Sequence, residues 1–336
     1  MIQQSIDLSA YTTFGVHATA ALFGTFDSEE SLSSILSTNI KRPILILGGG
    51  SNILATKDID ALVLKNEISG IKVVTEDDDF VIVESGAGEI WHEFVMHCVQ
   101  NDWSGIENLS LIPGSVGASP MQNIGAYGVE IKDVFDSLDA FHIQDGTIKT
   151  FTKEECEFGY RESVFKRKLK DQYIILRVRF KLSKRPKINT KYGAIEAQLQ
   201  SKGITSPTIK DVSDAVIAIR SSKLPDPKIL GNAGSFFKNP VVTTSVANSI
   251  LEDYPDAPVY DTTDKELKKL AAGWLIEKAG WKGKRIGNCG VHEKQALVLV
   301  NFGGATGSEI FNLSQQILDD VYRMFGVQLE REVNIL

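Results

Sequence analysis

Three consecutive glycines follow a short apolar run near the start of the chain. Residues 43–47 (PILIL) are typical of a buried strand, and they lead directly into residues 48–52 (GGGSN). Glycine has no Cβ, so backbone N–H groups at such a point can closely approach an anionic group such as a phosphate. A tight connection between two strands explains this run equally well when it is considered alone. The run has neither GxGxxG nor GxxxxGK[ST] spacing, which disfavours a nicotinamide dehydrogenase or a P-loop enzyme.

A second segment rich in small residues covers 108–128 (NLSLIPGSVGASPMQNIGAYG). It shows no helical or strand period, so we predict a loop or a set of short turns. A loop of this length inside a compact domain is usually functional. Two such loops around one extended anionic ligand indicate a dinucleotide.

Elements of both kinds are predicted around these loops, so we expect a mixed α and β fold. An Asp27-x-x-Glu30 capping box and a Thr306-x-x-Glu309 capping box each predict the start of a helix, and Gly326 predicts the end of the second. Further helices are predicted at 89–100 and 210–220, and strands at 61–65, in a hairpin over 71–85, and at 137–143, 148–151, 173–182, 296–300 and the final residues. A length of 336 residues indicates two or three domains.

Charge and apolar content exclude several classes of partner. The chain has 36 Lys and Arg against 43 Asp and Glu, a net charge of -7, and it has no long basic run, so we expect no nucleic acid partner. Residues 1–10 lack the basic and apolar regions of a leader peptide, and no run of about 18 apolar residues occurs, so we expect no membrane insertion.

Cysteine and histidine spacing indicates neither a disulfide framework nor a metal site. Cys98, Cys156 and Cys289 are odd in number and far apart, which fits a reducing cytoplasm. His92 and His97 lie five residues apart, which on a helix separates the imidazoles by about 140° and prevents them from binding one ion together. We therefore expect no metal.

Five segments, in order along almost the whole chain, resemble the UDP-N-acetylenolpyruvoylglucosamine reductase family. They are GGGSN, IPGSVGASPMQNIGAYG, the Tyr160-Arg161-x-Ser163-x-Phe165 pattern, GNAGSFFKNP at 231–240 and LEREV at 329–333. The resemblance implies an α+β fold of three α/β domains, two of which form an FAD-binding module of the vanillyl-alcohol-oxidase type. The third, C-terminal domain would bind the substrate.

Domain boundaries follow from the resemblance together with the changes in composition. We expect the first FAD-binding subdomain at 1–67, with residues 330–336 returning to it, and the second at 68–219. Residues near 186–215 look like the insertion of the type I subgroup. The substrate-binding domain would cover 220–329.

The activity that the resemblance implies is reduction of UDP-N-acetylglucosamine enolpyruvate to UDP-N-acetylmuramate in peptidoglycan precursor synthesis. NADPH would reduce a non-covalently bound FAD, the flavin would deliver a hydride to C3 of the enolpyruvyl group, and a proton would reach C2. By the match to the family patterns, Arg161 is the cation at the substrate carboxylate, Ser235 the proton donor and Glu332 a third catalytic residue. Considered singly, Arg161 could instead form a domain–domain salt bridge, and Ser235 could be an N-cap for a following turn. Glu332 could be an exposed acid of the last strand.

Cofactor and substrate residues are likewise implied by the resemblance. The FAD-binding residues would be Gly48, Gly49, Gly50, Ser51, Asn52, Ser115, Gly117, Ala118, Ile124, Gly125 and Gly128. The UDP-sugar would be bound by Tyr192, Lys223, Asn239 and Gln295.

Two departures from the family pattern bear on these assignments. The chain ends in EVNIL where the family commonly has Arg after EV, which affects the surroundings of Glu332. His17 in TTFGVH raises the alternative of covalent flavin attachment, which is not expected in these reductases. The alternative function is an FAD-dependent sugar or alcohol oxidase on the same scaffold. We expect a monomer that acts in the cytoplasm.

Overall fold

The computed structural model of the protein describes residues 1–38 and 41–336, which divide into two compact units. The first unit comprises Met1–Ile6, Ala20–Gly49 and Asp60–Ser222, and the second comprises Asp7–Thr19, Gly50–Ile59 and Lys223–Leu336. Each unit is therefore built from three separate stretches of chain. The boundaries of the three expected domains stay predictions.

The first unit begins with a four-stranded sheet covered by one helix. Its strands lie in the order β1 (Gln3–Asp7), β2 (Thr19–Phe26), β5 (Ile59–Asn66) and β3 (Ile44–Leu47). Helix α1 (Glu29–Leu36) buries Leu32 and Ile35 in a core that includes strand β5. The predicted helix is confirmed, but its predicted cap is wrong, because Ser28 caps the helix in a reciprocal box with Ser31. A serine one residue after Asp27 competes for the same N–H groups.

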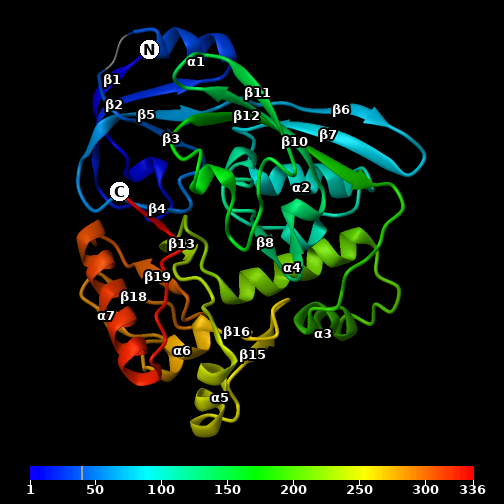
Figure 1. The fold of residues 1–336 in the computed structure, drawn as a ribbon, viewed down its shortest axis with the longest axis vertical. Helices are drawn as coiled ribbons and strands as arrows, with labels where there is room; N and C mark the ends of the chain where they lie inside the picture. The colour runs from blue at the N-terminus through cyan, green and yellow to red at the C-terminus, as the bar shows by residue number, and fades with distance from the viewer. Residues whose placement is uncertain (39–40) are drawn as a thin grey trace. The chain divides into compact units, whose positions relative to one another are not determined.

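A five-stranded antiparallel sheet forms the larger part of the first unit. Its strands lie in the order β11 (Ile148–Thr152), β10 (Phe135–His142), β12 (Tyr173–Ser183), β7 (Phe80–Gly86) and β6 (Ile71–Glu76). Helix α2 (Trp91–Gln100) lies against one face, where Phe94 and Phe180 have ring centroids 5.0 Å apart (Figure 1). The predicted hairpin over 71–85 and helix over 89–100 are confirmed, although the helix begins two residues late.

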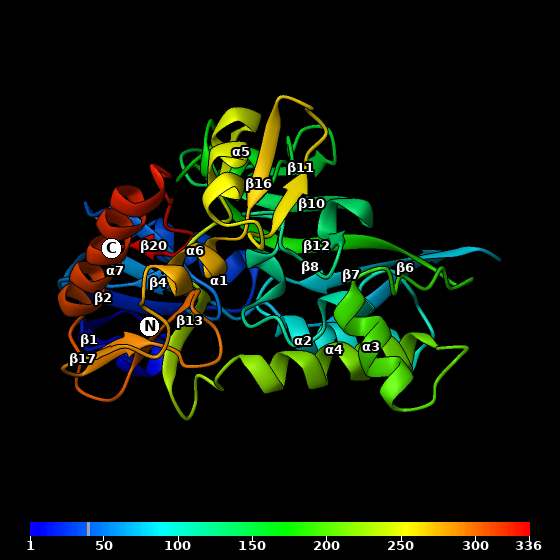
Figure 2. The ribbon, with the colours of Figure 1, turned by 90° about the horizontal axis from the view of Figure 1, so that it is seen from below.

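Two further helices complete the first unit. Helices α3 (Gly193–Ser201) and α4 (Ile209–Lys223) pack side by side through Ile195 and Leu199 on one and Val212 and Val216 on the other (Figure 2). The sequence predicted α4, but α3 was not predicted, because the polar run around Glu196 gives it only a weak apolar face.

The second unit contains three small sheets and three α-helices around its own core, and the smallest sheet is the pair of strands that includes the chain end. One sheet has the order β13 (Gly231–Ser235), β19 (Val298–Asn301), β18 (Cys289–Val291) and β17 (Arg285–Ile286), and another has the order β14 (Val241–Thr243), β16 (Leu267–Leu270) and β15 (Val259–Asp261). The helices are α5 (Thr244–Asp253), α6 (Ala272–Lys278) and α7 (Gly307–Phe325).

Helix α7 and the chain end agree with their sequence signals. The Thr306 and Glu309 capping box is present, and Gly326 ends α7 with a φ of 66°. The last strand, β20 (Asn334–Ile335), is short and pairs in parallel with β4 (Ile53–Leu54). Among the described residues, no helix combines the length and apolar character needed to cross a membrane.

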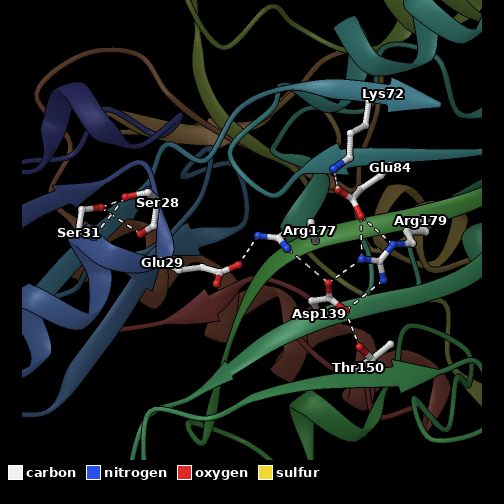
Figure 3. Close-up of polar contacts among 9 residues, drawn as sticks. All are labelled: Ser28, Glu29, Ser31, Lys72, Glu84, Asp139, Thr150, Arg177 and Arg179. Carbon is white, nitrogen blue, oxygen red and sulfur yellow. Dashed lines mark hydrogen bonds and ion pairs between the residues drawn. The ribbon is translucent and has the colours of Figure 1, made fainter. Parts of the chain in front are cut away.

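A network of ion pairs joins helix α1 to the polar face of the large sheet within the first unit (Figure 3). Asp139 accepts hydrogen bonds from both terminal nitrogens of Arg179, at 3.0 and 2.6 Å, and one from Thr150 at 2.7 Å. The carboxylate of Glu84 accepts a hydrogen bond from the Nε of Arg179 at 2.7 Å. Arg177 lies 3.6 Å from Asp139 and forms an ion pair with Glu29 of α1. The network thereby connects four strands (β7, β10, β11 and β12), and Arg177 links it to helix α1.

We expect Asp139→Asn to lower the urea midpoint at pH 7 by the equivalent of about 2 kcal/mol, as for a hydrogen bond to a charged group. Burial opposes ionisation of Asp139, but the hydrogen bonds from Arg179 and Thr150 outweigh it, so the pKa lies below its ordinary value. Such a carboxyl stabilises the fold above its unfolded pKa of about 4, and the stabilisation is lost as pH falls through the folded pKa. The difference from wild type should therefore shrink below about pH 4. Asp78→Asn, at an exposed turn, is the control, and equal effects of both variants would contradict the prediction.

Candidate functional site

The glycine run lies at the end of strand β3 and contacts the second small-residue loop. A Cβ built on Gly49 would lie 2.8 Å from the Cα of Gly114, and one built on Gly48 would overlap the hydroxyl of Ser115. The first two predicted glycines are therefore required by close approach of the two loops within the first unit. A larger side chain at Gly49 would displace the backbone of Gly114, and one at Gly48 would displace the side chain of Ser115.

The run continues into the second unit with Gly50, Ser51 and Asn52. Gly50 has a φ of 60°, and a Cβ there would overlap the carbonyl oxygen of Tyr11. The side chain of Asn52 donates to the carbonyl oxygen of Glu332 at 3.3 Å. Across residues 1–38 and 41–336, none of the N–H groups from Gly48 to Ser51 donates to a backbone carbonyl. Four consecutive backbone donors therefore stay available for an anionic group.

The second loop differs from this arrangement, because several of its N–H groups donate to backbone carbonyls of the first unit. It contains a short 3₁₀ turn (Val116–Ala118) and a hairpin of β8 (Gly125–Ala126) and β9 (Val129–Glu130), as the predicted set of short turns requires. The N–H of Gly117 donates to Ala87 at 2.9 Å and that of Ala118 to Ser115 at 3.1 Å. The N–H of Ile124 donates to Ser119 at 3.1 Å. This loop brings the backbone of Gly114 close to Gly49 and contributes the hydroxyl of Ser115. Gly128, at the hairpin, is exposed.

Arg161 lies beside the hairpin in the first unit. One terminal nitrogen donates to the carbonyl oxygen of Gly125 at 2.6 Å, and a Cβ on Gly125 would lie 3.2 Å from the other. The backbone of Arg161 has a φ of 54°, in the left-handed region that favours glycine. A non-glycine residue in this region costs about 1 to 3 kcal/mol, and such positions cluster at functional sites. The structure thus brings Arg161 and Gly125 together.

Arg220 and Tyr127 belong to the same cluster, although sequence reasoning did not identify them. Arg220 on α4 donates to the carbonyl oxygen of Leu111 at 3.2 Å and forms a hydrogen bond with Tyr127. Burial lowers the pKa of Arg220, Tyr127 opposes this shift, and the nearby charge of Arg161 adds to it. The ring of Tyr127 meets that of Tyr192, with centroids 5.2 Å apart. The available signal was the place of Arg220 at the end of the helix predicted over 210–220, three residues before the predicted substrate residue Lys223.

Two half-buried guanidinium groups and two phenols therefore share one region of the first unit. Burial raises the pKa of Tyr127, an effect that the charge of Arg220 partly offsets, so its hydroxyl stays a neutral hydrogen-bond donor near neutral pH. Cations and neutral donors in this combination suit an anionic ligand with carboxylate or phosphate groups.

Ser235 and Glu332 lie on neighbouring stretches of backbone in the second unit. Ser235 is the last residue of strand β13 and is exposed. The N–H of Glu332 donates to the carbonyl oxygen of Phe236 at 2.8 Å, and Phe237 pairs with Arg331 as an isolated bridge. Ser235 caps no helix, because the next helix, α5, is capped by Thr243.

The predicted UDP-sugar residues of the second unit lie in different surroundings. The amide oxygen of Asn239 accepts from Ala272 at 2.9 Å, at the start of α6. The amide oxygen of Gln295 lies 3.1 Å from a Cβ built on Gly273, at the same end of that helix. Lys223 is exposed at the last residue of α4. Asn239 and Gln295 thus lie near the start of α6.

The histidines that were considered have other contacts. The Nδ1 of His92 accepts from the N–H of Leu111 at 3.0 Å, and His97 packs against the ring of Trp103. His17 is exposed and lies 3.1 Å from the carboxylate of Asp7.

Comparisons with known proteins match the chain along its whole length. The model of the UDP-N-acetylenolpyruvoylglucosamine reductase C-terminal domain matches residues 226–336, and that of an FAD binding domain matches residues 20–152. The UDP-N-acetylenolpyruvoylglucosamine reductase of Flavobacterium johnsoniae is 54% identical over 336 residues, with 100% of this chain and 99% of the relative covered. The reductase of the same name from Pseudomonas aeruginosa is 50% identical, with 99% and 98% covered.

A solved structure agrees with these relatives. The crystal structure of UDP-N-acetylenolpyruvylglucosamine reductase from Thermus caldophilus has a TM-score of 0.69 and 25% identity, with 100% of this chain and 99% of that chain covered. The C-terminal model includes Ser235 and Glu332, and the FAD-binding model includes both small-residue loops. The chain belongs to the UDP-N-acetylenolpyruvoylglucosamine reductase family.

Proposed function

We propose that this protein reduces UDP-N-acetylglucosamine enolpyruvate to UDP-N-acetylmuramate, with NADPH as reductant and FAD as cofactor. The observation that carries the proposal is 54% identity over the full length to a reductase of that name. The product would serve peptidoglycan precursor synthesis. We expect the enzyme to act as a monomer in the cytoplasm.

The residues present fit a dinucleotide cofactor. Gly48 to Ser51 offer four consecutive N–H groups that donate to no backbone carbonyl in the described residues, which suits a pyrophosphate. Asn52 adds a side-chain amide to that segment, and Ser115 adds a hydroxyl from the second loop. Residues Gly117, Ala118, Gly125 and Gly128 would line the flavin with small side chains or none, and Ile124 would add an apolar side chain. The FAD-binding model covers Gly48 to Asn52 and the whole second loop.

We expect Gly49→Ala to abolish stable FAD binding. Its Cβ would lie 2.8 Å from the Cα of Gly114, so one of the two loops must move and the N–H groups lose their arrangement. Flavin absorbance per protein after purification measures the effect, and we expect the purified variant to carry almost no flavin. Gly193→Ala is the matched control, because a Cβ there meets no atom within 4 Å. Full flavin content in the Gly49→Ala variant would contradict the assignment of Gly48 to Ser51 as the pyrophosphate-binding segment.

When bound, FAD supplies the hydride that NADPH donates and that C3 of the enolpyruvyl group accepts. Addition at C3 develops negative charge on C2 and the adjacent carboxylate, which requires a fixed cation and a positioned acid. Arg161 would hold the carboxylate, and Ser235 would donate the proton to C2. Glu332, whose backbone is bonded to the residue after Ser235, would help if it carries a proton or shares a hydrogen bond with the substrate carboxylate.

The remaining polar residues would bind the UDP part of the substrate. Tyr192 and Lys223 supply a phenol and an ammonium for the diphosphate, and Asn239 and Gln295 supply amides close to the start of α6. Arg220 would add a second guanidinium beside Arg161. These assignments rest on the match to the family and on the chemistry of each group.

The test is an anaerobic titration of the purified protein. NADPH should bleach the flavin absorbance, and the enolpyruvyl substrate should restore it in the absence of oxygen. Acid precipitation should release the flavin, since attachment through His17 is not expected. The proposal fails if an alcohol or sugar bleaches the flavin and only oxygen restores it, because that behaviour belongs to an oxidase.

A further inference from the structure

Asn123 is a fully buried polar residue that connects the two segments around Arg161. Its exposure is 0%, and its φ of 46° lies in the left-handed region that asparagine tolerates better than most residues. Its side-chain nitrogen donates to the carboxylate of Glu130 at 3.0 Å and to the carbonyl oxygen of Gly159 at 2.9 Å. Its side-chain oxygen accepts from the N–H of Lys132 at 3.1 Å. Both ends of the amide are therefore used.

The contact with Gly159 reaches the turn that carries Arg161. Gly159 and Glu162 exchange two backbone hydrogen bonds, at 3.0 and 3.3 Å, and enclose Tyr160 and Arg161 between them. Arg161 occupies the third position of this turn with a φ of 54°, where glycine or asparagine is normally found. A strained residue persists only where its surroundings hold it in place. The bond from Asn123 to Gly159 provides such a constraint.

The contacts with Glu130 and Lys132 reach the hairpin that receives the Arg161 side chain. Strand β9 ends at Glu130, which pairs with Gly125 on β8. The carbonyl oxygen of Gly125 accepts the bond from Arg161 at 2.6 Å. Asn123 therefore holds the backbone of Arg161 at one end and the acceptor of its guanidinium at the other. All of these residues belong to the first unit.

We infer that Asn123 is a positioning residue that places the Arg161 guanidinium for the carboxylate of the enolpyruvyl substrate. This inference rests on the proposed function of Arg161. A guanidinium has five N–H donors in a planar fork, so its direction decides whether it meets a carboxylate with two parallel bonds. A misplacement of about 1 Å can cost roughly 100-fold in rate.

The decisive variant is Asn123→Asp, which has nearly the same shape but loses both donors. Its new carboxylate oxygen would face the Glu130 carboxylate and the Gly159 carbonyl, so both contacts become repulsive. We expect the holoenzyme to be bleached by NADPH at the wild-type rate. Restoration of flavin absorbance by substrate should slow by about 10- to 100-fold, and the dissociation constant of the substrate, measured by calorimetry, should rise.

A second substitution tests the contact itself. Glu130→Gln places a donor opposite the new carboxylate, so the double variant of Asn123→Asp with Glu130→Gln should recover part of the lost rate. Asn123→Gly removes the amide while keeping the left-handed backbone without strain, and it should show the same selective slowing if the aspartate variant does not fold. Asn66→Asp is the matched control, because Asn66 is another buried asparagine that bonds backbone groups, at Ile68 and Ile175, away from Arg161.

Each outcome decides between positioning and a general structural role. Normal restoration by substrate in both Asn123 variants would overturn the inference. The inference would also be overturned if the Asn123 variants slowed bleaching by NADPH and restoration by substrate equally. Slowing of restoration by the same factor in Asn66→Asp would overturn it as well. If removing the Arg161 side chain leaves restoration normal while the Asn123 variants slow it, the proposed function of Arg161 fails, and with it the route by which Asn123 acts.

Discussion

The Ser235→Ala variant is expected to keep the first half of the reaction and lose most of the second. NADPH should bleach its flavin at close to the wild-type rate, because no proton from Ser235 is needed for that step. Restoration of absorbance by the enolpyruvyl substrate should slow by roughly 10² to 10⁴, as when a positioned general acid is lost. Stopped-flow absorbance separates the two halves.

The structure supplies a matched control for this variant. Ser245→Ala removes an exposed serine from α5 in the same unit, and both halves should keep their rates. Since Ser235 is exposed at the end of a strand, its loss leaves no buried polar group unpaired, and the urea midpoint should hardly change. If the substrate restores the flavin absorbance of Ser235→Ala at the wild-type rate, the proton comes from another source, such as water or Glu332.

Removal of the Arg161 side chain should separate activity from stability. Arg161→Gly loses the cation at the developing negative charge, and we expect restoration by substrate to slow by about 10² to 10³ with weaker substrate binding. Glycine adopts a φ of 54° without backbone strain, which stabilises the folded state. This gain offsets part of the destabilisation that comes from the greater conformational freedom of glycine in the unfolded chain. The urea midpoint should therefore change by the equivalent of less than about 1 kcal/mol.

The comparison variant at this position is Arg161→Lys. It keeps the charge and the strained backbone but lacks the planar fork, so it should recover only part of the rate. A large loss of stability in Arg161→Gly, with activity per folded holoenzyme unchanged, would show that Arg161 is a structural ion-pairing residue. The two measurements use the same purified samples.

Local signals predicted those parts of the fold that depend on a few consecutive residues. The capping box at Thr306 and the glycine at 326 define α7, and both act over one turn of helix. The cap of α1 was predicted at Asp27 and lies at Ser28, because two adjacent residues of similar capping strength can each serve. Helix α3 has a weak apolar face, so its formation depends on packing against α4.

The candidate site was predicted from patterns, and its long-range contacts were not. The glycines at 48 and 49 were expected to admit a phosphate, whereas the structure shows that Gly49 also admits the backbone of Gly114 and Gly48 the side chain of Ser115. Arg220 and Tyr127 lie 93 residues apart in the sequence, and nothing in either segment alone indicates their hydrogen bond. Such pairs are decided by tertiary packing.

The interleaved composition of the two units has a consequence for synthesis of the chain. The core of the second unit includes Phe14, Val16 and Leu54, and the rings of Phe14 and Phe236 are 6.1 Å apart. These early residues leave the ribosome long before the stretch from Lys223 onward, with a delay of roughly 10 to 30 s at common elongation rates. During that interval their apolar side chains have no partner from the later part of their core, and a nascent chain in this state is open to aggregation or chaperone binding.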